Sequence, residues 1–192
     1  MFSGIVETVG LVNSLTYSLD DIKLTITPCE YFSDLKVGDS IAINGVCLTI
    51  TDLQGETFNV TAVPETLRRS NLQHLSIDCL VNLERAIKAN DRIGGHYVQG
   101  HVDDMGEIIE IKAQIFKISV PSNLTKYIVN KGYIALDGMS ITVIEANEKW
   151  FSVTLIPHTK KVSIAAHYQL GTKINIEVDI LGKHIEKLAR MN

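Results

Sequence analysis

A thiol, a hydroxyl and an imidazole occupy matched places in a sequence that repeats itself. Cys47 lies in NGVCLTI, and Ser140 holds the same place in DGMSITV ninety-three residues later. His101 stands where the first copy has Ile5. A thiolate is a strong nucleophile, and a histidine that titrates near neutral pH is the natural general base. Two similar pockets with unlike reactive groups predict a reaction in which two molecules of related substrate take different roles.

The repeat is most evident in its prolines. A proline fixes φ and removes a backbone donor, yet the four prolines fall into two pairs at one spacing, Pro28 with Pro121 and Pro64 with Pro157. The same shift places FNVTAVPET on FSVTLIPHT and VNLE on INIE, and FSGIVETVG matches VQGHVDDMG. The period is too long for a solenoid. We expect two similar domains, 1–90 and 91–179, followed by a C-terminal oligomerisation helix, 180–192.

Each copy is predicted to be all-β. Short apolar or alternating runs such as KLTIT, SIAIN and VCLTIT are separated by turn signals, and Asn44-Gly45 and Asp137-Gly138 favour tight hairpins. About six strands per copy suit a small closed barrel, because closure removes exposed edges. PCEYFSDL and PSNLTKYIVN favour short helices, and PETLRRSNL is a helix or a loop. Leu181, Ile185 and Leu188 form one stripe of the C-terminal helix, which packs on its own barrel or mediates oligomerisation.

Composition and charge disfavour several classes of function. The chain has 192 residues, of which 45% are apolar, and its net charge is −4 without any block of like charges. Nucleic acid and membrane surfaces are therefore not expected as partners. The sequence has neither the pattern of a signal peptide nor an apolar stretch of membrane-spanning length, so we expect a soluble, cytoplasmic protein.

Cysteine and histidine spacing gives no sign of a metal. The chain has three cysteines, an odd number, so free thiols are expected. Cys29 and Cys79 are expected to behave as inert apolar side chains. His96 and His101 lie five residues apart without a third ligand in view. Gly94-Gly95 lacks the spacing of a nucleotide-binding motif and is interpreted as a linker.

Hydroxyl side chains recur at matched places of the two copies. Strand alternation puts Cys47, Thr49 and Thr51 on one face in the first copy, and Ser140 and Thr142 on the same face in the second. Taken singly, such threonines are ordinary β-formers on a solvated face. Their recurrence, together with that of Thr66 at Thr159, favours a ligand-binding face instead.

Eight segments in order, spread over nearly the whole chain, resemble the riboflavin synthase family of the α-subunit type. They are MFSGIVETVG, NGVCLTI, PETL, NLERA, GGHYVQGHVD, KGYIALDGMSITV, IPHT and NIEVDILGKHIEKL. The resemblance implies two tandem six-stranded, Greek-key-like β-barrels and a homotrimer with the C-terminal helix at its centre. It further implies active sites between the N-terminal barrel of one subunit and the C-terminal barrel of a neighbour.

The resemblance also implies the reaction. Two molecules of 6,7-dimethyl-8-ribityllumazine dismutate, one giving a four-carbon unit to the other, and yield riboflavin and 5-amino-6-ribitylaminouracil. The family needs no metal and no cofactor, and lumazine synthase is a candidate partner.

The resemblance places the substrate in two pockets. The set expected in the first barrel is Phe2, Gly4, Ile5, Val6, Cys47, Leu48, Thr49, Thr61, Ala62 and Thr66. The set expected in the second barrel is Gly100, His101, Val102, Lys131, Ser140, Ile141, Thr142, Thr154, Ile156, His158 and Thr159. Backbone amides and threonine hydroxyls suit a flat heterocycle with carbonyl and ring-nitrogen acceptors, because they orient it with few charges.

The chemistry of the lumazine suggests roles for the reactive groups. Its 7-methyl group is acidic, since the anion is delocalised into the ring. We expect His101, with Ser140 as a hydrogen-bond relay, to remove this proton in the second pocket. Cys47 is expected to add at C7 of the other lumazine or to position a water that does. Thr142 and Asp179 complete the predicted catalytic set, with Asp179 stabilising cationic or protonated intermediates.

Two alternatives belong to other functional classes. The lumazine and yellow fluorescent proteins of luminous bacteria resemble the same duplicated barrel but bind a fluorophore without turning it over, and they lose the cysteine that matches Cys47. A flavin-binding oxidoreductase barrel would need a nicotinamide domain, for which the chain has neither room nor a Gly-rich motif. The presence of Cys47, His101 and Ser140 favours the enzyme.

Overall fold

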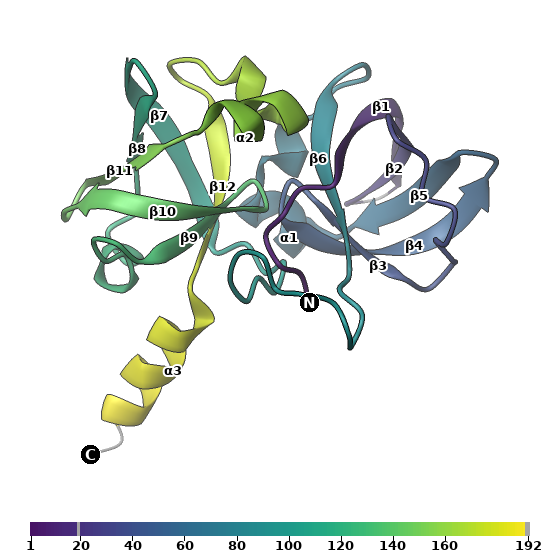
Figure 1. The fold of residues 1–192 in the computed structure, drawn as a ribbon. Helices are drawn as coiled ribbons and strands as arrows, with labels where there is room; N and C mark the ends of the chain where they lie inside the picture. Colours follow the sequence, from purple (N-terminus) through teal and green to yellow (C-terminus); the bar gives the residue numbers. More distant parts are fainter. Residues whose placement is uncertain (19, 191–192) are drawn as a thin grey trace.

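Two closed β-barrels lie side by side, and a C-terminal helix extends away from the second of them (Figure 1). The computed structural model describes residues 1–18 and 20–190. The N-barrel closes in the order β1-β2-β5-β4-β3-β6, and the C-barrel in the order β10-β11-β8-β7-β12-β9. The two barrels have the same topology: each N-barrel strand corresponds to the C-barrel strand numbered six higher, and corresponding strands have corresponding neighbours around the closed ring. The prediction of two six-stranded barrels is confirmed, while the predicted domain limits, 1–90 and 91–179, stay predictions.

The strands and helices recur in matched order. The N-barrel strands are β1 (Thr8–Ser18), β2 (Asp21–Pro28), β3 (Ser40–Ile43), β4 (Val46–Gln54), β5 (Thr57–Ala62) and β6 (Leu80–Arg85). The C-barrel strands are β7 (Asp104–Lys112), β8 (Ile115–Ser119), β9 (Tyr133–Leu136), β10 (Met139–Ala146), β11 (Trp150–Thr154) and β12 (Lys173–Val178). The helices are α1 (Pro64–Arg69), η1 (Asn71–His74), η2 (Thr125–Tyr127), α2 (Pro157–Val162), η3 (Ile164–His167) and α3 (Ile180–Ala189), where η marks a 3₁₀ turn.

Two of the predicted short helices are wrong in whole or in part. Residues 28–35 form no helix; β2 ends at Pro28, and the chain then turns so that Phe32 packs in the N-barrel core. Within residues 121–130 only the turn η2 forms. Short segments gain too few backbone hydrogen bonds to be helical unless packing favours it. PETLRRSNL does form α1 and the start of η1, and α3 forms as predicted, although residues 191–192 lie outside the described residues.

The Asn-Gly and Asp-Gly pairs turn the chain between β3 and β4 and between β9 and β10. Asn44 and Asp137 have φ values of 46° and 45°, the left-handed conformation that tight hairpins require. The turns set the strand register, so that Val46, Leu48 and Ile50 are buried in the core while Cys47 and Thr49 face outward. The predicted alternation of β4 is therefore confirmed.

Each barrel has its own apolar core, and a third cluster lies between the barrels. It consists of Phe2, Ala42, Val98 and Ala135, with Cys47 packed against it. Phe2 comes from the N-terminal segment and Val98 from the segment between the barrels, and the backbones of these two residues exchange hydrogen bonds of 2.7 and 3.2 Å. The two segments that lead into the barrels are thus hydrogen-bonded to each other in the region between the barrels.

A buried polar network also joins the barrels with approximate twofold symmetry. The Asn82 side-chain amide donates to the Asp137 carbonyl oxygen at 2.9 Å, and the Asn175 amide donates to the Asn44 carbonyl oxygen at 2.8 Å. Asn71 adds a bond of 2.9 Å to the Asp137 carboxylate. Because an unpaired buried polar group costs free energy, a network with these partners satisfied favours one relative placement of the barrels.

Asp137 makes the stability of this network depend on pH. Burial raises the pKa of its carboxyl to about 7, while hydrogen bonds from Tyr168, Asn175 and Asn71 oppose the rise. Since the folded-state pKa exceeds the unfolded-state value, the contribution of this group is fully present below the unfolded-state pKa and is lost as the pH rises through about 7.

Asp137→Asn copies Asn44 of the other barrel and is expected to remove that loss. The free energy of unfolding, measured by denaturant titration at several pH values between the two pKa values, should then fall less steeply in the variant, by on the order of 1 kcal/mol per pH unit. Equal slopes in the variant and the natural chain would show that Asp137 does not titrate in this way.

Candidate functional site

Each reactive strand is covered by a segment from the other copy. The Gly4 carbonyl oxygen accepts from the Ser140 N–H at 2.7 Å, so the N-terminal segment lies on the C-barrel. The Gly100 carbonyl oxygen accepts from the Cys47 N–H at 2.9 Å, so the segment leading into the C-barrel lies on the N-barrel. The predicted grouping is corrected: Gly4-Ile5-Val6 belongs with Ser140, and Gly100-His101-Val102 belongs with Cys47. The reason is the exchange of the two leading segments, which the strand pattern does not reveal.

Glycine is required where each segment touches the facing strand. Gly4 and Gly100 have φ values of +75° and +81°. A Cβ at Gly4 would lie 2.6 Å from Cβ of Ser140, and one at Gly100 would lie 2.5 Å from Cβ of Cys47. Glycine therefore allows the backbone to pass directly over the reactive residue, in a conformation that other residues rarely adopt.

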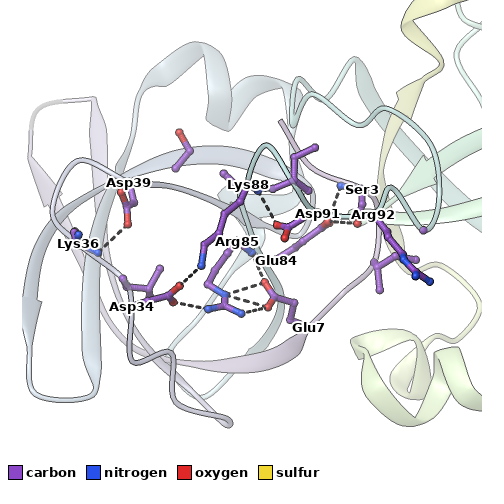
Figure 2. A pocket seen from close by; sticks show the side chains of 16 residues that line it. Ser3, Glu7, Asp34, Lys36, Asp39, Glu84, Arg85, Lys88, Asp91 and Arg92 are labelled. Atoms are coloured by element: carbon purple, nitrogen blue, oxygen red, sulfur yellow. Dashed lines mark hydrogen bonds and ion pairs between the residues drawn. The ribbon is translucent and has the colours of Figure 1, made fainter.

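A buried glutamate holds each segment by its backbone amides. Glu84 Oε1 accepts from the Ser3 N–H at 2.7 Å and the Gly4 N–H at 3.1 Å, an arrangement visible in part in Figure 2. Glu177 accepts in the same way from the Gln99 N–H at 2.6 Å and the Gly100 N–H at 2.9 Å. Burial raises the pKa of both carboxyls, that of Glu84 to about 7, and the amide bonds oppose the rise. These matched glutamates, visible in VNLE and INIE, were not singled out by the sequence analysis.

A cavity of about 450 Å³ on the N-barrel brings Cys47 and His101 together. Its lining also includes Thr66, Gly100 and Val102 from the predicted site. Charged groups at the cavity that the sequence analysis did not predict are Glu65, Arg69, Asp103 and Lys183. Cys47 is half-buried and His101 is exposed, so both can meet a bound molecule. The cavity brings together a thiol and an imidazole, the side-chain types that serve as nucleophile and general base in other proteins.

On the C-barrel, Ser140 is paired with His96 rather than His101. His96 Nδ1 lies 2.7 Å from Ser140 Oγ, and the buried imidazole stacks on Tyr133 with ring centroids 5.2 Å apart. Burial lowers the pKa of His96, and the nearby Asp179 carboxylate opposes this shift. Within the single chain Ser140 is therefore bonded to His96, and the relay from Ser140 to His101 stays a prediction. The repeat could not reveal His96, because its counterpart would precede Met1.

The remaining predicted residues differ in how they can reach a ligand. The side chains of Leu48, Ala62 and Ile141 are in the barrel cores, which leaves only their backbones to face a ligand, and Phe2 is fully buried behind the reactive strands. Asp179 caps α3, with its Oδ1 accepting from the Leu181 N–H at 3.0 Å. Exposed or half-buried members are Ile5, Val6, Thr49, Thr61, Lys131, Thr142, Thr154, Ile156, His158 and Thr159.

A second cavity, of about 830 Å³, lies beside Glu84, and several of the charged side chains that line it are paired with one another (Figure 2). Arg85 bridges Glu7 and Asp34, and Lys88 bonds Asp34 at 2.8 Å. These cations hold the pKa of Asp34 down at about 2. Of the predicted site residues, Ile5 alone lines this cavity. The reactive groups belong to the smaller one.

Residues 1–18 and 20–190 contain neither a metal-binding cluster nor a membrane-spanning helix. No three His, Cys, Asp or Glu side chains gather there in a group that could hold a metal ion. None of the helices in that part of the chain is long and apolar enough to cross a membrane.

The fold and the two covered strands correspond to a known domain. A family model described as the lumazine binding domain matches residues 3–86 and again residues 99–179. A solved structure of LumP complexed with riboflavin shares the fold, with a TM-score of 0.83 at 18% identity over 93% of this chain and 100% of that one. The structure of LumP complexed with 6,7-dimethyl-8-(1'-D-ribityl) lumazine gives a TM-score of 0.80 at 19% identity. The class defined here is that of duplicated lumazine-binding proteins.

Relatives of higher sequence identity show which family within this class the chain belongs to. The riboflavin synthase of Schizosaccharomyces pombe is 43% identical over 98% of this chain and 93% of its own length. That of Mycobacterium tuberculosis is 42% identical over 99% and 98%, and that of Bacillus subtilis is 41% identical over 96% and 88%. The chain belongs to the riboflavin synthase family.

Proposed function

We propose that the chain catalyses the dismutation of two molecules of 6,7-dimethyl-8-ribityllumazine into riboflavin and 5-amino-6-ribitylaminouracil. The observation that carries this proposal is the full-length similarity to riboflavin synthases, with Cys47 and His101 present in one cavity. The repeated barrel supports it, because two similar pockets suit two copies of one substrate.

The two barrels differ in the pair of reactive side chains that each offers. The N-barrel offers Cys47 and His101, and the C-barrel offers Ser140 hydrogen-bonded to His96. We assign to Cys47 the addition at C7 of one lumazine, either directly or through a water. His101 is proposed as the base that takes the 7-methyl proton of the other lumazine, with the Ser140 hydroxyl, held by His96, contacting the resulting anion. Thr142 and Asp179 stay in the proposed catalytic set.

Much of the rate acceleration is proposed to come from holding two flat heterocycles face to face. Orientation of two bound reactants supplies up to about 7–11 kcal/mol in favourable systems. The threonines that recur on both reactive strands, and the backbone amides beside them, suit the polar edge of the heterocycle. The two pockets must therefore face each other in the active assembly.

Assembly into a homotrimer would bring an N-barrel pocket against a C-barrel pocket of the next subunit. The support is α3, whose apolar stripe is uncovered: Leu181, Ile185 and Leu188 are 59%, 67% and 65% exposed. An apolar helix face left in solvent favours association with copies of itself. Association with lumazine synthase and a cytoplasmic location stay predictions from the sequence.

Ile185→Asp is expected to dissociate the trimer, because it places a charge at the centre of the apolar stripe. Sedimentation should then report single chains, and activity should fall with the loss of the shared site. Lys187→Asp, on the opposite face of α3, is the matched control and should stay trimeric. A trimeric Ile185→Asp chain would rule out α3 as the assembly element.

The proposed function is tested by incubating the purified chain with 6,7-dimethyl-8-ribityllumazine alone and following the longer-wavelength absorbance of riboflavin. Appearance of riboflavin is the expected result. Tight binding without riboflavin would instead indicate a fluorophore-binding protein.

A further inference from the structure

Asp103 ties the segment that carries His101 to the end of the C-barrel. It lies two residues after His101, and its backbone N–H donates to the Ile176 carbonyl oxygen at 2.9 Å. Its Oδ2 accepts from the Val178 N–H at 3.0 Å. Its carbonyl oxygen accepts from Arg69 of α1 at 3.3 Å. The segment is thus fastened at the edge of the cavity that holds Cys47 and His101.

The remaining carboxylate oxygen of Asp103 reaches α3. Asp103 Oδ1 lies 2.7 Å from Lys183 Nζ, and the two side chains are only 18% and 27% exposed. Lys183 also lines the N-barrel cavity. Farther along α3, Glu186 binds Lys126 and Tyr127 of the C-barrel. The helix is therefore held through Lys183 and Glu186, and the contact made by Lys183 ends beside His101.

The first copy contains the equivalent hydrogen bonds between its leading segment and the last strand of a barrel, but no contact with a helix. Glu7 matches Asp103: its N–H donates to the Leu83 carbonyl oxygen at 2.9 Å, and its Oε1 accepts from the Arg85 N–H at 2.7 Å. Its carboxylate pairs with the Arg85 side chain, which also pairs with the exposed Asp34 of the N-barrel (Figure 2). The contact with α3 is thus particular to the segment that bears the histidine.

We propose that Asp103 and Lys183 are positioning residues. Through this ion pair, the position of α3 determines where His101 lies in the N-barrel pocket. This inference rests on the proposed function and adds to it a coupling between the assembly helix and the active site. A partly buried ion pair with a 2.7 Å contact restrains both partners. Without Lys183, Asp103 Oδ1 would be hydrogen-bonded by water instead, and the segment that carries His101 would be free to shift. Small displacements of a reacting group lower reaction rates strongly.

The test is a double-mutant cycle of Lys183→Met, Asp103→Asn and the combined variant, with kcat, KM and the Kd for lumazine measured on chains shown by sedimentation to be trimeric. Lys183→Met keeps the apolar stem but removes the charge. Each single variant is expected to lower kcat about 10- to 100-fold with Kd changed less than about threefold. The combined variant should be no slower than Asp103→Asn, because Lys183 acts through Asp103. Lys183→Arg should restore most of kcat.

Glu7→Gln provides the matched control. It loosens the equivalent fastening, so its effect should multiply with that of Lys183→Met, as expected for independent sites. A Lys183→Met chain with unchanged kcat, fully multiplicative effects of Lys183→Met and Asp103→Asn, or a loss of kcat only in dissociated chains would each overturn the coupling. If Asp103→Asn fails to fold, Lys183→Met and Lys183→Arg still decide the question. Absence of riboflavin with the natural chain would remove the proposed function instead, a distinguishable result.

Discussion

His101→Gln is expected to lower kcat by about 100-fold or more while leaving the Kd for lumazine nearly unchanged. Glutamine has similar polarity and size but cannot take up and release a proton, and general base catalysis is typically worth 10²- to 10⁴-fold. The imidazole is exposed in the cavity that also contains Cys47, so a bound molecule can reach it. Because proton removal from the 7-methyl group precedes carbon transfer in the proposed mechanism, exchange of the methyl hydrogens with deuterated solvent should slow in parallel.

The control for this variant is His74→Gln. His74 is an exposed histidine of η1 and does not line the N-barrel cavity, so its replacement should leave kcat within about twofold of the natural value. A His101→Gln chain with full turnover and full methyl exchange would show that another group is the base, and His96 beside Ser140 would be the next candidate.

Cys47→Ser is expected to lower kcat by roughly two orders of magnitude, because a serine hydroxyl is a far weaker nucleophile than a thiolate. The fold should be unaffected, since Ser140 holds the matched position on β10 and shows that a hydroxyl fits there. Rapid mixing of the variant with lumazine should also lack any early spectral species that the natural chain forms by addition at C7.

The corresponding control is Cys29→Ser. Cys29 is an exposed free thiol outside the cavity, and its replacement should change neither the rate nor the spectra. If Cys47→Ser turns over at the natural rate, the thiol has no nucleophilic role, and activation at C7 must come from a water held by the neighbouring backbone.

Much of the fold could be predicted because the repeat supplies independent checks. The same shift of ninety-three residues relates α1 to α2, η1 to η3 and β6 to β12, as the proline pairs predict. Alternation along β4 correctly placed Cys47 and Thr49 on one face, since that pattern is local. Residues 28–35 were predicted helical from their proline and composition, but packing of Phe32 into the barrel prevailed.

The arrangement of the site was less predictable, because it depends on contacts between copies. Gly4 and Gly100 have equivalent sequence surroundings, and nothing in a strand pattern indicates that each lies on the other copy's barrel. His96 has no counterpart in the first copy, so comparing the copies could not select it. The contact of Asp103 with Lys183 joins residues eighty positions apart and required the tertiary structure.

The stoichiometry of the reaction is the most direct test of the proposed dismutation. The natural chain would be mixed with 6,7-dimethyl-8-ribityllumazine as sole substrate, and substrate loss, riboflavin and 5-amino-6-ribitylaminouracil would be quantified together by chromatography. Two lumazines consumed for each riboflavin, with an equal amount of the uracil released, is the predicted result for two pockets that hold donor and acceptor. Riboflavin formed in any other proportion, or lumazine bound in both pockets without either product, would contradict it.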